Sequence, residues 1–195
     1  MLLDRGTARQ FYFGAGEIAC ATTRPAPHNR AILNNMNRAL VLACGNSLRG
    51  DDGAALHIVR ELQQGGCEPE TLIHFEHQWT PELAEVISET ELVIFVDTSV
   101  ALAPGEIACQ QLNPIYKSMA GSSHQTTPAS LLALAEALYK AHPARAFLVM
   151  IGGASFALSE ELSEPVRKAI PHAVESIKAL LSGVTPPESS RTATS

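Results

Sequence analysis

Apolar and polar positions follow one another along the chain in blocks that predict alternating strands and helices. Three unbroken apolar runs, at 39–43, 92–96 and 146–151, are of strand length and typical of strands buried on both faces. After the first run, apolar residues recur at helical spacing between 55 and 62, and Gly65-Gly66 ends this helix. A strand, a polar loop and a helix therefore form the first predicted unit.

The following segment repeats this order and then departs from it. Residues 72–76 alternate in part and predict a second strand, and Thr80-Pro81-Glu82 offers a capping hydroxyl, a proline and an acid for a helix start. Residues 106–112 predict a further strand, which too few residues separate from the strand at 92–96 for a parallel crossover. We therefore expect the strand at 106–112 to run antiparallel at an edge of the sheet.

Two more helices complete the pattern. Apolar residues between 131 and 138 predict one helix, and residues 166–181 carry a single apolar face that predicts another. Pro171 lies inside the second of these helices, and we expect it to kink or divide the helix. Strands alternating with helices are the order of an α/β fold built on an open sheet.

Both ends of the chain are predicted to lie outside the core. Residues 1–35 show no sustained hydrophobic period and form an N-terminal extension, whereas Pro, Ser and Thr dominate 184–195 and predict a disordered tail. The predicted domain is therefore 36–183. A chain of 195 residues, of which 46% are hydrophobic, is long enough for one such core.

Composition narrows the class of function. The net charge of -6 and the lack of a clustered basic patch argue against binding to nucleic acid. Cys20, Cys44, Cys67 and Cys109 are far apart, which favours neither a zinc knuckle nor a disulfide framework and fits a reducing cytoplasm. The apolar runs are shorter than the ~20 residues that span a bilayer. We therefore expect a cytoplasmic protein without membrane insertion. We also expect it to be a monomer.

The candidate chemistry lies in loops next to the predicted strands. The first strand runs into G-N-S-L-R-G-D-D-G, where Asp52 precedes a helix, and Asp97 follows the apolar run at 92–96. His124 stands just before the helix at 131–138. Because the loops at the carboxyl ends of parallel strands meet on one rim, these three side chains are expected to converge. Two carboxylates and an imidazole suit a divalent transition metal such as nickel or zinc.

Simpler interpretations compete with a metal site. An aspartate at a helix start is commonly an N-cap, and the sequence does not decide which of Asp51 and Asp52 caps the helix. His124 taken alone is more often a loop or capping residue than a ligand. For the cluster of His74, Glu76 and His77 we favour a solvated or rim face, because strand alternation puts His74 and Glu76 opposite Phe75.

The glycine loop matches neither common phosphate-binding pattern, and its adjacent carboxylates would repel a phosphate. No G-x-S-x-G elbow is present, which argues against a serine hydrolase. We expect four residues to shape the loop: Gly45, Asn46, Gly50 and Gly53. A branched side chain at Gly53 would crowd the backbone or forbid the dihedral angles that the turn needs.

Three segments together resemble the hydrogenase maturation endopeptidases. They are G-N-S-L-R-G-D-D-G, then V-I-F-V-D-T-S with a following Pro-Gly, and S-S-H-Q-T-T-P-A-S-L-L-A-L-A-E, closed by G-G-A-S-F-A-L-S-E-E-L-S-E-P-V. The resemblance covers roughly 37–182. It implies a three-layer α/β/α sandwich of the phosphorylase/hydrolase-like type, with a five-stranded mixed sheet whose fourth strand is antiparallel.

The resemblance also implies a function and a set of site residues. Such enzymes remove a C-terminal extension from the large-subunit precursor of [NiFe] hydrogenases, and they recognise nickel already placed in that precursor. The nickel-contacting positions carry over to Asp52, Asp97 and His124. No permanent cofactor is expected, because the substrate supplies the nickel.

The cleavage step leaves alternatives open. Asp52 or Asp97 can act as general base for water, or the nickel of the substrate can polarise the water or the carbonyl. A non-catalytic nickel-handling chaperone for the same precursor would need the same three side chains. A small-molecule amidohydrolase or phosphorylase-like enzyme on a similar sheet is a further alternative, and it would need a tight pocket.

Overall fold

The computed structural model describes residues 39–66, 70–115 and 126–184. The predicted extension at 1–35, His124, and residues 185–195 of the predicted tail lie outside the described residues. Within the described part, no helix is long and apolar enough to cross a membrane.

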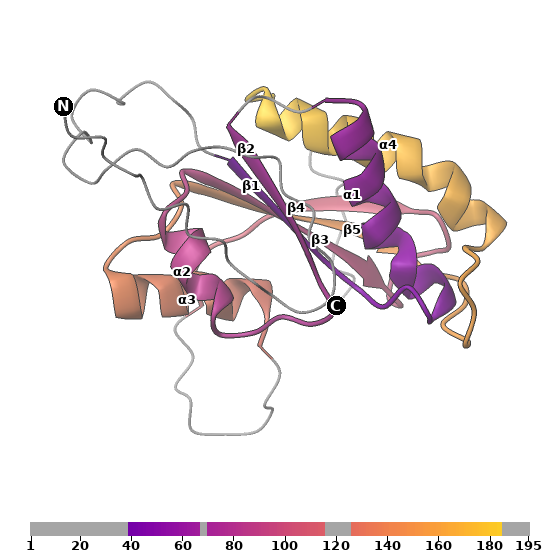
Figure 1. Ribbon diagram of the computed structural model, residues 1–195, viewed down its shortest axis with the longest axis horizontal. Coiled ribbons are helices and arrows are strands. Elements are labelled where there is room, and N and C mark those ends of the chain that lie inside the picture. The colour runs from indigo at the N-terminus through magenta and orange to yellow at the C-terminus, as the bar shows by residue number, and fades with distance from the viewer. Residues whose placement is uncertain (1–38, 67–69, 116–125, 185–195) are drawn as a thin grey trace, which may run out of the picture. The chain divides into compact units, whose positions relative to one another are not determined.

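In the described part of the chain, five strands form one mixed sheet in the order β2-β1-β3-β5-β4 (Figure 1). The strands are β1 (Ala39–Cys44), β2 (Thr71–Glu76), β3 (Leu92–Ser99), β4 (Ile107–Gln111) and β5 (Arg145–Gly152). All neighbouring pairs are parallel except β4 and β5. The prediction that the fourth strand runs antiparallel at an edge is therefore confirmed.

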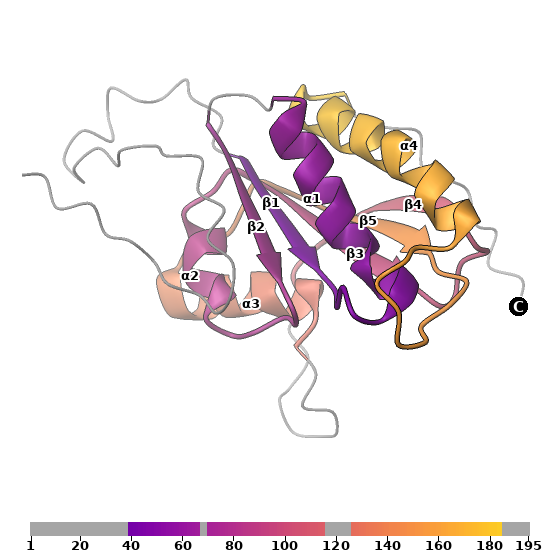
Figure 2. The same ribbon diagram turned by 45° about the vertical axis from the view of Figure 1, so that its right-hand side comes forward.

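Within the described residues, four α-helices cover the two faces of this sheet. They are α1 (Ala54–Gln64), α2 (Leu83–Ser88), α3 (Pro128–Tyr139) and α4 (Glu164–Leu181), and a single 3-10 turn, η2 (Gly50–Gly53), precedes α1. Helices α1 and α4 pack on one face, and α2 and α3 pack on the other (Figures 1 and 2). The predicted three-layer α/β/α sandwich is confirmed.

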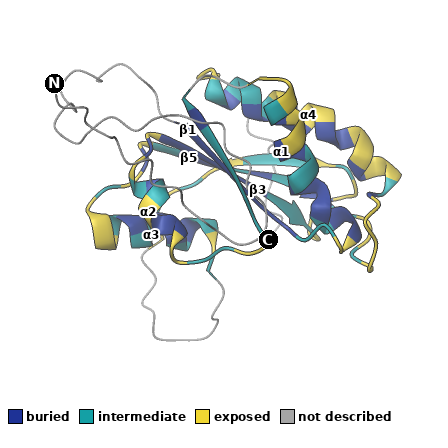
Figure 3. Ribbon diagram, in the orientation of Figure 1, coloured by how far each residue is buried: buried dark blue, intermediate teal, exposed yellow. Residues whose placement is uncertain are grey.

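Strand alternation explains why the central strands are apolar throughout. In β1, Val41 packs toward α1 and α4, whereas Leu40 and Leu42 pack toward α2 and α3. All three side chains are fully buried, and Figure 3 shows the central strands in the buried colour. A strand covered on both faces must be hydrophobic at every position, which is the pattern of the run at 39–43.

Two details of the predicted elements are wrong. Strand β3 continues past Val96 to Ser99, so Asp97 lies inside the strand, where it pairs in register with Met150 of β5. Helix α2 begins at Leu83 rather than at Pro81, because Pro81 and Glu82 form a turn without a side-chain cap.

Helix α4 runs unbroken through Pro171. The helix is not divided, because a proline removes only one backbone hydrogen bond while a whole face of the helix stays buried. The buried residues of that face are Val166, Ala169, Ile170, Ala173, Val174, Ile177 and Leu180.

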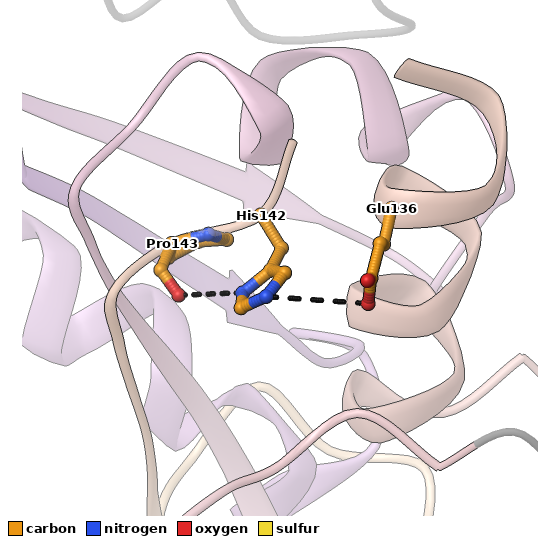
Figure 4. A network of polar contacts seen from close by, with 3 residues as sticks. All are labelled: Glu136, His142 and Pro143. Atoms are coloured by element: carbon orange, nitrogen blue, oxygen red, sulfur yellow. Dashed lines mark hydrogen bonds and ion pairs between the residues drawn. The ribbon is translucent and has the colours of Figure 1, made fainter. Parts of the chain in front are cut away.

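The remaining helix, α3, is fixed at both of its ends. The hydroxyl of Thr127 accepts a hydrogen bond from the N–H of Ser130, and the Ser130 hydroxyl accepts one from the N–H of Thr127. After the helix, His142 lies 4.0 Å from a carboxylate oxygen of Glu136 and 2.8 Å from the carbonyl oxygen of Pro143 (Figure 4). This network lies just before the first residue of β5, at the end of the sheet opposite the carboxyl ends of the parallel strands.

Candidate active site

The loop after β1 is folded tightly against its neighbours. The N–H of Gly45 donates to the carbonyl oxygen of Glu76 at 3.1 Å, and a Cβ at Gly45 would lie 2.0 Å from the carbonyl oxygen of Asp52. Gly50 has a φ of 55°, a conformation that favours glycine. The Asn46 side chain accepts a hydrogen bond from the N–H of Leu48. The loop therefore needs glycine at 45 for close approach and at 50 for its backbone conformation, and the Asn46 side chain adds a hydrogen bond. All three residues were predicted to shape the loop.

Gly53 is subject to only one of the two constraints predicted for it. Its φ of -76° and ψ of -4° are ordinary helical values, so the expectation that it needs unusual dihedral angles is wrong. A Cβ at Gly53 would lie 3.1 Å from the Cα of Ser47. Crowding of the backbone is the constraint that remains at this position.

Asp51 holds two loops together and is fully buried. Its carboxylate accepts hydrogen bonds from the N–H groups of Ala154, Ser155 and Ser163, at 2.7 to 2.9 Å, and from the Ser163 hydroxyl. Burial by itself would raise the pKa of Asp51, but these four bonds hold the pKa below its ordinary value. Asp51 thus fastens the loop of residues 45–53 to the loop of residues 153–163, which Figure 2 shows side by side.

Asp52 turns away from this network and back over its own loop. Its carboxylate accepts a hydrogen bond from the N–H of Asn46 at 3.0 Å and stays partly exposed. The N-cap of α1 is Gly53, and it makes no side-chain capping bond. Neither Asp51 nor Asp52 therefore caps α1, and Asp52 is the one of the two that is open to solvent.

Asp97 lies near Asp52 and is partly buried on β3. One carboxylate oxygen accepts a hydrogen bond from the N–H of Thr98 at 2.8 Å, and the other accepts one from the indole N–H of Trp79 at 3.3 Å. Burial raises the pKa of Asp97 to about 6 against these two bonds, and the negative charge of Asp52 adds to the rise. An N-cap role for Asp97 is excluded, because the residue lies inside a strand.

Asp97 belongs to a row of polar side chains that crosses three strands. Cys44 pairs in register with Glu76 of β2. On the other side, Ala43 pairs with Val96 of β3, so the next residues, Cys44 and Asp97, are level with each other. Because alternate residues share a face, Glu76, Cys44 and Asp97 all lie on the side of α2 and α3. Asp52 comes to the same place from the loop above, since its charge acts on Cys44 as well.

The thiol of Cys44 is neutral at this position. Burial, together with the negative charges of Asp97, Asp52 and Glu76, raises its pKa to about 12. A thiol in this state is neither a nucleophile nor a good metal ligand, because both roles need the thiolate. The chemistry of the row therefore rests on its carboxylates.

The predicted cluster of His74, Glu76 and His77 divides between two environments. His74 and Glu76 lie on the same face of β2, and burial lowers the pKa of His74 and raises that of Glu76. His77 lies beyond the strand and is exposed. Glu76 is thus part of the row of polar side chains that contains Asp97. The sequence predicted only a solvated or rim face for Glu76.

The third predicted metal-contacting residue, His124, lies outside the described residues. Among the described residues, no group of three His, Cys, Asp or Glu side chains is placed to hold a metal ion. The structure therefore brings Asp52 and Asp97 together without testing the complete trio.

Sequence reasoning missed two neighbours of Asp97. Trp79 donates to Asp97 and packs edge-on against Phe95, with ring centroids 5.5 Å apart. In the sequence alone, Cys44 is one of four widely spaced cysteines with no predicted role. Its position as the last residue of β1, directly before the glycine loop, was the signal that could have drawn attention to it.

Comparison with known proteins assigns this arrangement to a family. A family model described as hydrogenase maturation protease (HycI) matches residues 57–180, which is more than half of the chain. The chain belongs to the hydrogenase maturation protease family. The matched range includes Asp97 and begins just after the loop that carries Asp52. A search of curated proteins found no match to this chain.

Several solved structures with a fold similar to that of this chain are of hydrogenase maturation proteases. The hydrogenase maturating endopeptidase HybD from E. coli is 24% identical, with a TM-score of 0.63 over 75% of this chain and 93% of that one. The [NiFe] hydrogenase maturation protease HybD from Thermococcus kodakarensis is 27% identical, with a TM-score of 0.56 over 74% and 99%. A hydrogenase 2 maturation peptidase from Thaumarchaeota archaeon SCGC_AB-539-E09 is 25% identical, with a TM-score of 0.57 over 74% and 98%.

Proposed function

We propose that this protease removes the C-terminal extension of a [NiFe] hydrogenase large-subunit precursor after nickel has been inserted. The observation that carries the proposal is the approach of Asp52 to Asp97, close enough for one charge to help raise the pKa of the other carboxyl. Two carboxylates on the rim of the sheet are suited to meeting a cation that arrives with the substrate. In this proposal nickel belongs to the precursor, and Asp52, Asp97 and His124 contact it there.

The same carboxylates supply a general base for hydrolysis. A carboxyl with a pKa of about 6, such as Asp97, is largely ionised at neutral pH and is still basic enough to accept a proton from water. The water oxygen then bonds to the carbonyl carbon of the scissile peptide, and the amine leaves with a proton. Either Asp97 or Asp52 fills this role, and nickel in the substrate would further polarise the water or the carbonyl.

The test is cleavage of purified precursor with and without nickel. We expect the protease to shorten the nickel-loaded precursor and to leave the nickel-free form intact. Asp52→Asn, Asp97→Asn and His124→Ala should each slow cleavage by roughly 100-fold or more, the scale of a lost general base or ligand. Glu91→Gln is the matched control, because Glu91 is exposed and lies just before β3, at the opposite end of that strand from Asp97.

Each outcome has a distinct meaning. Binding of the nickel-loaded precursor without shortening would support a nickel-handling chaperone instead of a protease for this substrate. Turnover of a small amide in the absence of precursor would support the small-molecule enzyme. Normal processing by both aspartate variants, with unchanged melting curves, would remove Asp52 and Asp97 from the mechanism.

A further inference from the structure

Two exposed leucines lie beside the candidate site on backbone segments that are bonded to each other. Leu48 is 51% exposed and Leu158 is 89% exposed. The N–H of Ser159 donates to the carbonyl oxygen of Leu48 at 3.0 Å, and the N–H of Gly50 donates to the carbonyl oxygen of Ser159 at 2.6 Å. These bonds set the segments of Leu48 and Leu158 side by side, and we call the two residues the leucine pair.

The leucine pair is held in its exposed position by the buried carboxylate of Asp51. Asp51 comes from the loop of Leu48, and its partners Ala154, Ser155 and Ser163 come from the loop of Leu158. The two loops are thus one fixed unit rather than two independent segments. An apolar surface that is already ordered loses little conformational freedom when a partner covers it.

The surroundings of the leucine pair are acidic. Glu160 and Glu161 follow Leu158 after one intervening residue and are exposed, and neither makes an ion pair with another described residue. On the other side, the loop of Leu48 leads within four residues to Asp52. The nearby cations are Arg49 and Arg167, whose guanidinium donates to the carbonyl oxygen of Leu162, and the three carboxylates outnumber them. This surface therefore favours a partner that is apolar and carries positive charge.

We propose that the leucine pair docks an apolar segment of the hydrogenase precursor that has a basic residue beside it. The inference rests on the proposed function and names the surface by which the substrate is held. Leu48 and Asp52 share one short loop, so a polypeptide bound on the leucine pair continues directly to the carboxylates. Docking there aligns the scissile bond with Asp52 and Asp97.

The experiment measures precursor binding and cleavage by Leu48→Ser and Leu158→Ser. Because both side chains are largely exposed, the variants should melt like the unmodified protease. We expect roughly a tenfold rise in both Kd and KM for each variant, with kcat within about twofold, as for the loss of one leucine contact. Leu138→Ser is the matched control, since Leu138 is 62% exposed on α3 and far along the chain from both loops.

A second measurement tests the charge of the partner. In a variant carrying Glu160→Gln and Glu161→Gln, precursor binding should weaken and should depend less on salt concentration than in the unmodified protease. Salt dependence that does not change would overturn the basic part of the proposal.

Three results would overturn the docking surface. They are an unchanged Kd in both leucine variants, an equal effect of Leu138→Ser, and a leucine effect that appears only as the loss of self-association of the protease. Binding is measured separately from cleavage, so these results are distinguishable from failure of the proposed function. A precursor that binds through the leucine pair and is not cut would contradict the proposed function alone.

Discussion

Adjacent carboxylates at 51 and 52 serve different purposes because the 3-10 turn η2 sends their side chains in different directions. Asp51 is enclosed and accepts four hydrogen bonds from the loop of residues 153–163. Asp52 is partly exposed and accepts a single bond from Asn46. One residue therefore stabilises the rim, and its neighbour remains available for chemistry.

Asp51→Ala should destabilise the protease much more than Asp52→Ala. Removing the buried carboxylate leaves several donors without a partner, and we expect the free energy of unfolding to fall by about 2–4 kcal/mol. The pKa of Asp51 is lowered in the folded state, so its stabilisation is present above the unfolded value of about 3.9 and is lost as the pH falls through the lower folded pKa. Urea unfolding at pH 7 and at acidic pH measures both effects. Equal losses in the two variants would contradict the assignment.

The raised pKa of Asp97 predicts an opposite dependence on pH. Between about pH 4 and pH 6 the folded state binds the extra proton, so the free energy of unfolding falls as the pH rises through this window. Asp97→Asn lacks this titration. Relative to the unmodified protease it should gain about 1–3 kcal/mol in stability between pH 4 and pH 7.

Trp79→Phe provides the companion measurement for Asp97. The variant removes the indole N–H that donates to the carboxylate and keeps an aromatic ring against Phe95. The pKa of Asp97 should therefore rise, because its ionised carboxylate has lost a hydrogen-bond donor. The fall in the free energy of unfolding should then extend to higher pH. Urea unfolding across pH 4 to 8 compares the two variants, and parallel pH profiles for Asp97→Asn and the unmodified protease would count against the raised pKa.

At the scale of elements, the loop between β1 and α1 is constrained by close approach of its backbone. A Cβ at Gly45 would meet the Asp52 carbonyl oxygen at 2.0 Å, whereas a Cβ at Gly53 would meet the Ser47 Cα at 3.1 Å. The first contact forces the loop to move, and the second needs a shift of only a few tenths of an ångström.

Gly45→Ala should therefore be more harmful than Gly53→Ala. We expect Gly45→Ala to lower the Tm by several degrees and to slow precursor processing, because it displaces the residue that carries the Asp52 carboxylate. Gly53→Ala should have a smaller effect on both. Thermal unfolding and a cleavage assay on the two variants give the comparison, and a reversed order would show that the contact at Gly45 relaxes without cost.

At the scale of the whole molecule, the chain divides into residues 1–36 and a separate compact unit, 37–195. We predict that deleting residues 1–35 leaves folding and processing intact, because the first core strand begins at Ala39 and the deleted segment lacks a periodic apolar face. Thermal unfolding and precursor cleavage by the shortened protein are the measurements. A Tm lower by several degrees would show that the extension packs on the core.

The sequence by itself determined the order of strands and helices and the antiparallel edge strand. These features depend on local periodicity and on the length of connections, both of which can be counted along the chain. It also determined that Asp52 and Asp97 lie near the carboxyl ends of β1 and β3, because every parallel strand delivers its following loop to the same rim. The end of β3 and the beginning of α2 were less well predicted, since neighbouring strands and turns extend or shorten an element.

Only the tertiary structure decided which polar groups meet. Glu76, Cys44 and Asp97 form a row because three strands align in one register, and the residue patterns of the separate strands do not contain that register. The choice between Asp51 and Asp52 likewise depended on donors about a hundred residues away, at 154, 155 and 163. A single sequence carries local propensities, whereas hydrogen bonds and charges act between groups that only folding brings together.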